Sequence, residues 1–245
     1  MPQVNITLGD KGGIGKSYVT AGMAQYRIDN IIGKPPLLFD LDYKTMTFHK
    51  YKGLDVELIN VETDGDIEKK KFDGLVNRIA LADDDDVFLF DIGSNVYIPL
   101  MNYMLVNEVM EMLVDHGVEI VLHVVIMGGQ ELNDTLNCLS ELAIGTPEGV
   151  ALSVWINQKN GKVESNGKTF EQSKLYEEVK DRIRTITYIP EWRPDMQHNV
   201  SDMLQQRVTY KVALTMDKYE IMDKQRLQVS QRSLYQAIRV SGVCS

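Results

Sequence analysis

Short apolar runs alternate with longer, mixed segments along most of the chain. Several runs, among them 87–92 and 119–127, consist mainly of Val, Ile, Leu and Phe. Runs of this kind are typical of strands that are covered on both faces, as in parallel sheets. The pattern predicts strands at 4–8, 36–41, 56–61, 87–92, 119–127, 151–157 and 185–189.

The segments between these runs have the length of crossover helices. They are 16–32, 67–82, 100–116, 131–142 and 170–184. This alternation predicts the α/β class, with a doubly wound, mostly parallel sheet of about seven strands flanked by helices. No Pro- or Ser-rich linker interrupts it, so we expect a single domain over 1–245 with a C-terminal helical segment at about 195–240.

Composition narrows the class of protein. The chain has a net charge of −9, and its two cysteines form no metal or redox motif. It contains no apolar run of the roughly 18 residues that span a bilayer, and its first residues do not resemble a signal peptide. We therefore expect a cytoplasmic protein without an integral membrane segment.

Charge is distributed unevenly along the chain. Residues 206–245 carry seven basic and three acidic side chains, whereas residues 1–205 have a net charge of −13. Overall acidity argues against coating of nucleic acid by the whole protein. The basic C-terminal segment leaves two interpretations open: a solvated helix, or a local contact with DNA or an acidic protein surface.

The most informative stretch is glycine-rich and joins the first predicted strand to the first predicted helix. It reads Gly-Asp-Lys-Gly-Gly-Ile-Gly-Lys-Ser over 9–17. Glycines allow backbone N–H groups to surround phosphate oxygens, and the helix N-terminus adds partial positive charge. Lys16 can reach the β- and γ-phosphates, and the Ser17 hydroxyl can bind Mg²⁺. The pattern G-x-x-x-x-G-K-[ST] is broken only at Asp10.

With this departure, the stretch resembles the deviant Walker A motif of the ParA/MinD superfamily of P-loop ATPases. The resemblance implies ATP and Mg²⁺ as ligands and an ATP-dependent homodimer. It also implies that Lys11 reaches across the dimer to the partner's phosphates.

The second and fourth predicted strands each end in acidic residues. Asp40 and Asp42 form the D-x-D of switch I in this superfamily, which implies that Asp42 orients the attacking water and Asp40 supports it. Tyr43-Lys44 replaces the usual Pro-Gln, which leaves switch geometry and rate open. The strand 87–91 resembles Walker B, so that Asp91 would hold Mg²⁺ and the Gly93 N–H would face the γ-phosphate.

The base-binding region is less strongly marked. The stretch 157–160 lacks the carboxylate of a guanine-binding N-K-x-D motif, which favours adenine. Asn157 and the turn at Pro190 resemble the superfamily's adenine pocket, although both are equally consistent with plain strand ends. Trp192 either covers the base or packs in the core.

The expected site is as follows. The catalytic residues are Lys11, Lys16, Asp42 and Asp40, the nucleotide-binding residues are Gly12, Gly13, Ile14, Gly15, Lys16, Ser17, Tyr18, Gly93, Asn157 and Pro190, and the Mg²⁺ residues are Ser17 and Asp91.

Two local features have more than one interpretation. The run of four aspartates at 83–86 is a solvated turn or, less simply, a metal site. The Asn-Gly pairs at 160–161 and 166–167 indicate a small hairpin, which is either a specificity element or an exposed loop.

Beyond the superfamily, nearly the whole chain resembles TraL-type conjugal transfer proteins of plasmids. The matching segments include 127–130, 168–172 and 201–205 as well as the glycine-rich loop. The resemblance implies a slow Mg–ATP switch that supports conjugative DNA transfer and binds transfer proteins. The alternatives are a plasmid partition ATPase, which shares these motifs and binds partition proteins, and a nucleotide-sensing scaffold with little hydrolysis.

Overall fold

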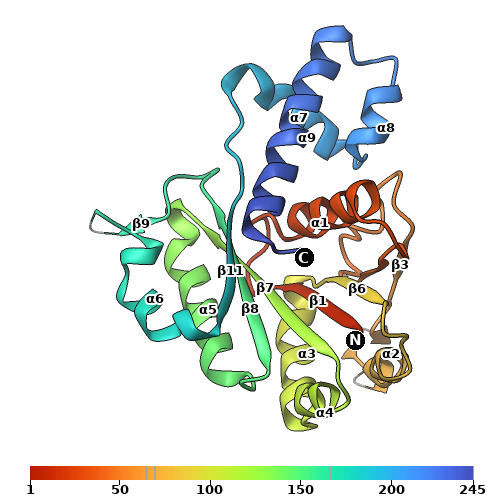
Figure 1. The fold of residues 1–245 in the computed structure, drawn as a ribbon, viewed down its shortest axis with the longest axis vertical. Helices are drawn as coiled ribbons and strands as arrows, with labels where there is room; N and C mark the ends of the chain where they lie inside the picture. Colours follow the sequence, from red (N-terminus) through yellow and green to blue (C-terminus); the bar gives the residue numbers. More distant parts are fainter. Residues whose placement is uncertain (64–65, 69, 166, 245) are drawn as a thin grey trace.

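A computed structural model describes residues 1–63, 66–68, 70–165 and 167–244 and shows a sheet between two layers of helices (Figure 1). The sheet has seven strands in the order β11-β8-β7-β1-β6-β2-β3, and neighbouring strands are parallel throughout. They are β1 (Gln3–Leu8), β2 (Leu37–Asp40), β3 (Val56–Leu58), β6 (Val87–Asp91), β7 (Glu119–Met127), β8 (Val150–Asn157) and β11 (Ile183–Tyr188). The predicted fold class and all seven predicted strands are confirmed.

Each face of the sheet has its own hydrophobic core. One core is formed with α2 (Lys70–Ala80), α3 (Ser94–Val106), α4 (Val109–Asp115), α5 (Leu132–Gly145) and α6 (Lys174–Val179). The other is formed with α1 (Lys16–Asn30), α7 (Pro194–Gln205), α8 (Tyr210–Thr215) and α9 (Ile221–Ser241). Because both faces of β1, β7 and β8 are covered, almost all of their residues are buried, which explains their continuous apolar runs.

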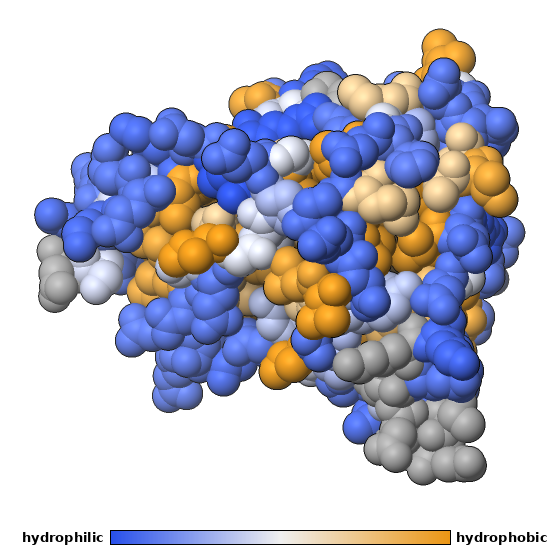
Figure 2. Space-filling model, turned by 90° about the horizontal axis from the view of Figure 1, so that it is seen from below, coloured by the Kyte–Doolittle hydropathy of each residue, from blue (hydrophilic) through white to orange (hydrophobic). Residues whose placement is uncertain are grey.

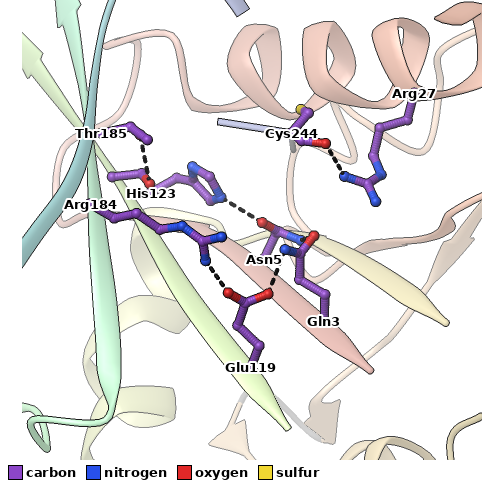
Figure 3. Close-up of polar contacts among 9 residues, drawn as sticks. Gln3, Asn5, Arg27, Glu119, His123, Arg184, Thr185 and Cys244 are labelled. Carbon is purple, nitrogen blue, oxygen red and sulfur yellow. Dashed lines mark hydrogen bonds and ion pairs between the residues drawn. The ribbon is translucent and has the colours of Figure 1, made fainter. Parts of the chain in front are cut away.

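A polar network crosses the centre of the sheet (Figure 3). His123 Nε2 lies 3.0 Å from Asn5 Oδ1, and Trp155 Nε1 donates to His123 Nδ1 at 3.1 Å. Since Nδ1 accepts, the proton of the neutral ring is on Nε2, and burial lowers the pKa of His123 to about 3. At the edge of the network, Glu119 accepts hydrogen bonds from Gln3 and Arg184. The network therefore links β1, β7 and β8 through satisfied buried groups, and a more exposed ion pair between Glu119 and Arg184 extends it to β11.

Two predicted helices differ from the structure. The segment 100–116 is divided between α3, which begins earlier at Ser94, and α4, because Glu108 adopts a left-handed conformation (φ 49°) between them. The segment 170–184 yields two 3-10 turns, Phe170–Gln172 and Lys180–Arg182, with α6 between them. The Ser173 hydroxyl accepts from the Tyr176 N–H and thus starts α6 separately from the preceding turn.

Two minor ladders lie outside the main sheet. One joins β9 (Glu164–Ser165) to β10 (Lys168–Thr169), which confirms the predicted hairpin; Asn166 of its turn lies outside the described residues. The other joins β4 (Glu62–Thr63) to β5 (Asp66–Ile67). Gly128, the residue after β7, packs against the turn at 160–161. A Cβ on Gly128 would lie 1.9 Å from the Gly161 carbonyl oxygen, so only glycine fits at this position. A 3-10 turn, Gly129–Glu131, then leads into α5.

The acidic run 83–86 forms a turn with its own cation. Lys34 Nζ lies 2.5 Å from Asp86 Oδ1 and 3.0 Å from Asp83 Oδ2. The Asp83 N–H also donates to the Asp86 carboxylate at 2.9 Å. Because Lys34 already compensates the clustered charge, the geometry agrees with the solvated-turn interpretation.

The C-terminal helices pack on α1. A Cβ on Gly22 would lie 3.1 Å from Leu234 Cδ2, so α1 and α9 are in close contact. Arg27 Nη1 donates to the Cys244 carbonyl at 2.9 Å and holds the end of the described chain against α1 (Figure 3). Of the basic residues in this region, Arg226 pairs with Asp223 and Lys218 pairs with Asp202.

The surface shows no continuous apolar band on the side seen from below. Hydrophobic residues gather there in several patches separated by hydrophilic residues (Figure 2). None of the helices in the described part of the chain is long and apolar enough to cross a membrane.

Candidate functional site

The motifs selected from the sequence meet at the carboxyl ends of three adjacent strands. In the parallel register, Thr7 of β1 and Asp40 of β2 both lie opposite Asp91 of β6. The glycine-rich loop follows β1, Asp40 ends β2 and Asp42 follows it, and Gly93 follows β6. This edge is where open α/β sheets bind their ligands.

The glycine-rich loop curves around an open space to form a cradle and contains several glycines in conformations that other residues rarely adopt. Gly9, Gly13 and Gly15 have φ values of 148°, 78° and 104°, which favour glycine. Asp10 is not among the positive-φ residues, so the loop tolerates a side chain at the position that breaks the motif. A Cβ on Gly12 or Gly13 would meet nothing within 4 Å, so the space beside the loop is open.

Helix α1 begins inside this loop without a side-chain cap. Its N-cap is Gly15, and the next residue, Lys16, is 8% exposed. Lys16 Nζ donates to the Lys11 carbonyl, and burial lowers the pKa of Lys16 while Asp91 and Asp42 oppose that shift. Uncapped N–H groups and a buried cation are the features that favour an anion at a helix start.

Asp91 and Ser17 form a buried oxygen pair beside the loop. Ser17 Oγ donates to Asp91 Oδ2 at 2.6 Å, and Thr20 Oγ1 lies 3.4 Å from Asp91 Oδ1. Burial, and then the neighbouring Asp40, raises the pKa of Asp91 to about 7. Clustered carboxylate and hydroxyl oxygens are the ligands that Mg²⁺ prefers. Thr20 was not predicted, because its relation to Asp91 arises from packing of α1 on β6.

Asp40 holds the switch I loop. Its side chain is fully buried and accepts the N–H groups of Asp42 at 2.7 Å and His49 at 2.8 Å. Burial raises the pKa of Asp40, and these backbone hydrogen bonds oppose the rise. Asp40 therefore fixes both ends of the 42–49 loop.

Asp42 is partly exposed and lies against Gly93. Its carboxylate accepts the Thr45 N–H at 3.1 Å and the Thr45 hydroxyl. A Cβ on Gly93 would lie 2.7 Å from Asp42 Cγ, so only glycine permits this approach of switch I to the start of α3. The structure thus brings together Asp42 and Gly93, two of the expected site residues.

Lys11 points to a different helix. Its Nζ lies 2.9 Å from Asp134 Oδ2 on α5, and both side chains are roughly half exposed. The hydrogen bond and charge of Asp134 raise the pKa of Lys11. Lys11 is thus held at the rim of the cradle while its carbonyl accepts from Lys16.

A cavity of about 260 Å³ borders the other side of the loop. Asn157, at the end of β8, donates to the Ile14 carbonyl at 2.9 Å and accepts the Lys159 N–H at 3.1 Å. The cavity is lined by Gly13, Gly15, Tyr18, Asn157, Gln158, Lys159, Ile189, Pro190, Glu191, Trp192, Gln197 and Leu204. The predicted Tyr18, Asn157 and Pro190 therefore belong to one pocket.

Trp192 forms a wall of this cavity. Its ring meets the Tyr18 ring edge to face at 6.0 Å, and Lys159 Nζ lies 6.0 Å from its centre. Gln197 and Leu204 of α7 were not predicted, since only the packing of α7 brings them to the loop.

Comparison with known proteins agrees with this geometry. Two curated proteins named "Protein TraL" from Escherichia coli are 37% and 36% identical to the chain over 244 residues, covering 99% of it and 100% of each relative. The chain belongs to the TraL family. No protein-family model matches it.

The TraL-family chain shares its fold with a solved structure. A chain of the MinC:MinD cell division protein complex from Aquifex aeolicus aligns with a TM-score of 0.50 and 14% identity, over 96% of each chain. The predicted resemblance to TraL-type proteins is confirmed, and the chain has the fold expected from the resemblance to ParA/MinD-like proteins. In this TraL-family protein, the candidate site combines a glycine-rich loop, the Ser17–Asp91 oxygen pair and a cavity of about 260 Å³.

Proposed function

We propose that this TraL-family chain is a Mg–ATP-dependent switch that supports conjugative plasmid DNA transfer. The main support for this proposal is that the expected site residues come together at one edge of the sheet. The glycine cradle, the Ser17–Asp91 pair, Asp42 and the cavity beside Asn157 come from separate parts of the chain and lie around one loop, 9–17.

The residues present fit Mg–ATP. The cradle has room where β-carbons are absent, and the uncapped start of α1 favours phosphate oxygens. Lys16 and the backbone of 12–18 would bind the phosphates, and Ser17 and Asp91 would hold Mg²⁺. The bound cation supplies charge neutralisation for phosphoryl transfer. The cavity lined by Tyr18, Pro190 and Trp192 would take the adenine ring.

The proposed ATP-dependent homodimer rests on the resemblance of Lys11 to the signature lysine of the ParA/MinD superfamily. In the proposed homodimer, Lys11 leaves Asp134 and binds the partner's phosphates. The ion pair that is lost is roughly half exposed, and such surface pairs contribute little to stability, so contacts with ATP can outweigh it. Nucleotide state would then set the affinity for transfer proteins, because contacts made in only one state supply the coupling.

Hydrolysis is proposed to be slow. Both Asp42 oxygens accept hydrogen bonds from Thr45, so Asp42 must change partners before it can orient water. The same observation favours the second candidate, a nucleotide-sensing scaffold that binds ATP with little hydrolysis. Plasmid partition shares the site but gains no support from the TraL relatives.

Light scattering with a slowly hydrolysed ATP analogue tests the switch. We expect wild type to double in mass, and Lys11→Ala to bind the analogue but remain a monomer. Lys180→Ala, a control that also removes an ion-paired surface lysine, should dimerise. A wild type that stays monomeric with analogue bound would refute the dimer switch. Phosphate release unchanged by Asp42→Ala would favour the scaffold, and mating beside plasmid-loss assays would separate transfer from partition.

A further inference from the structure

Asn95 is a partly buried polar residue that the predicted site does not use. It lies in the first turn of α3, two residues after Gly93. Its Nδ2 is buried and has no hydrogen-bond partner among the described residues. A buried amide without a partner is costly, so an asparagine at this place calls for a ligand or a second conformation.

Other buried asparagines of the chain are satisfied. Asn5 donates to the Gln3 side chain, Asn157 to the Ile14 carbonyl, and Asn199 to the Asp223 carboxylate. The N-cap of α3 is Gly93, which has no side chain, so Asn95 is not itself the N-cap residue of the helix. Among the described residues, its Nδ2 contributes no hydrogen bond to the fold.

The Asn95 amide lies beside the expected hydrolytic acid. A Cβ on Gly93 would lie 2.6 Å from Asn95 Oδ1 and 2.7 Å from Asp42 Cγ. The side-chain oxygen of Asn95 and the Asp42 carboxylate thus approach the same glycine, and a turn of the amide about its Cβ–Cγ bond would present Nδ2 to Asp42. Their chemistry is complementary, because a carboxylate only accepts hydrogen bonds and an amide nitrogen donates two.

We propose that Asn95 is a positioning residue for ATP hydrolysis, which rests on the proposed function. When the Asp42 loop closes on nucleotide, Asp42 releases Thr45 and accepts a hydrogen bond from Asn95 Nδ2. This contact orients Asp42 toward the attacking water. The water oxygen bonds to the γ-phosphorus, the bond from phosphorus to the β–γ bridging oxygen breaks, and ADP leaves with that electron pair; the water proton passes to the phosphate product.

Three variants separate positioning from binding. Asn95→Ala removes the amide, Asn95→Asp keeps its shape but removes the donor, and Asn95→Gln keeps the donor on a longer side chain. Asn102→Ala is the matched control, since Asn102 lies on the exposed side of the same helix. Measurements are affinity for a fluorescent ATP analogue, single-turnover phosphate release at saturating Mg–ATP, and trapping of Mg–ADP by aluminium fluoride.

We expect Asn95→Ala and Asn95→Asp to slow phosphate release about tenfold or more and to lose aluminium fluoride trapping, with analogue affinity within about threefold of wild type. Asn95→Gln should recover part of both, and Asn102→Ala should match wild type. Thermal unfolding of the nucleotide-free proteins checks folding, and the near-isosteric Asn95→Asp carries the test if Asn95→Ala unfolds.

Two results would overturn the inference alone: wild-type release and trapping in Asn95→Asp, or a loss of analogue affinity as large as the loss of rate. Failure of the wild type to bind and hydrolyse ATP would instead overturn the proposed function and the inference with it.

Discussion

The phosphate end and the base end of the candidate site are built in different ways. The phosphate end is one contiguous loop, 9–17, whose glycine conformations are set by local steric rules. The base end takes residues from α1, β8, the segment after β11 and α7. A contiguous loop carries its chemistry in its own sequence, whereas the base cavity exists only after the sheet and the C-terminal helices have packed.

The two ends also differ in charge. At the phosphate end, Asp40 and Asp91 are buried as neighbours, and burial raises the pKa of each. At the base end, Asn157 is the last residue of β8. Trp155 of the same strand donates a hydrogen bond to the neutral His123 of β7. Of the two ends, the phosphate end thus contains the buried carboxyl groups with raised pKa, and it is the end where a cation is expected.

The largest effect is expected from Asp91→Asn. Loss of the carboxylate should lower affinity for Mg–ATP by roughly 30-fold or more and remove its dependence on Mg²⁺. The nucleotide-free variant should be more stable than wild type at pH 8, because a carboxyl with pKa raised to about 7 costs stability as pH rises from 3.8 through 7. Calorimetry and urea unfolding measure the two effects. If Asp91→Asn were less stable than wild type at pH 8 and still bound ATP in a Mg²⁺-dependent way, the proposed difference between the two ends would be wrong.

His123, which lies beside the base end, should make the stability of the fold depend on pH in the acidic range. The unfolded histidine takes up a proton below pH 6.5, but the folded one, with pKa about 3, does not. The free energy of unfolding should therefore fall as pH drops below 6.5, by up to about 1.4 kcal/mol per pH unit from this group. Urea unfolding between pH 7 and 5 should show a smaller slope in His123→Gln than in wild type. Equal slopes would show that the ring is protonated in the fold.

Trp192→Ala should lower the affinity for ATP and for ADP by about tenfold. Because the ring lines the base cavity and not the phosphate cradle, ATP and ADP should lose the same affinity, with Mg²⁺ dependence retained. Tyr188→Ala, an exposed aromatic on β11 outside the cavity, is the control. A loss confined to ATP would place Trp192 in phosphate recognition instead.

The smallest effect is expected from Asp134→Ala. Release of Lys11 from its ion pair should strengthen ATP-dependent dimerisation by about two- to fivefold, because exposed pairs contribute little. Concentration-dependent light scattering measures the change. Weaker dimers would show that Asp134 itself contributes to the interface.

The sequence predicted the parts of the molecule that depend on local rules. Buried strands and the loop 9–17 follow from apolar runs and glycine spacing, and Asp40, Asp42 and Asp91 follow from their places at strand ends. Thr20, Asn95 and Leu204 carry no local signal, since their neighbours come from other elements. The break between α3 and α4 was missed because Glu108 adopts a positive φ that its residue type does not indicate.

Titration calorimetry of Mg–ATP into the full-length protein tests the central claim most directly. The account predicts one binding site per chain in wild type, loss of measurable binding in Lys16→Ala, and retained binding in Lys11→Ala. Absence of binding to wild type, or undiminished binding to Lys16→Ala, would contradict a nucleotide site built on the glycine-rich loop.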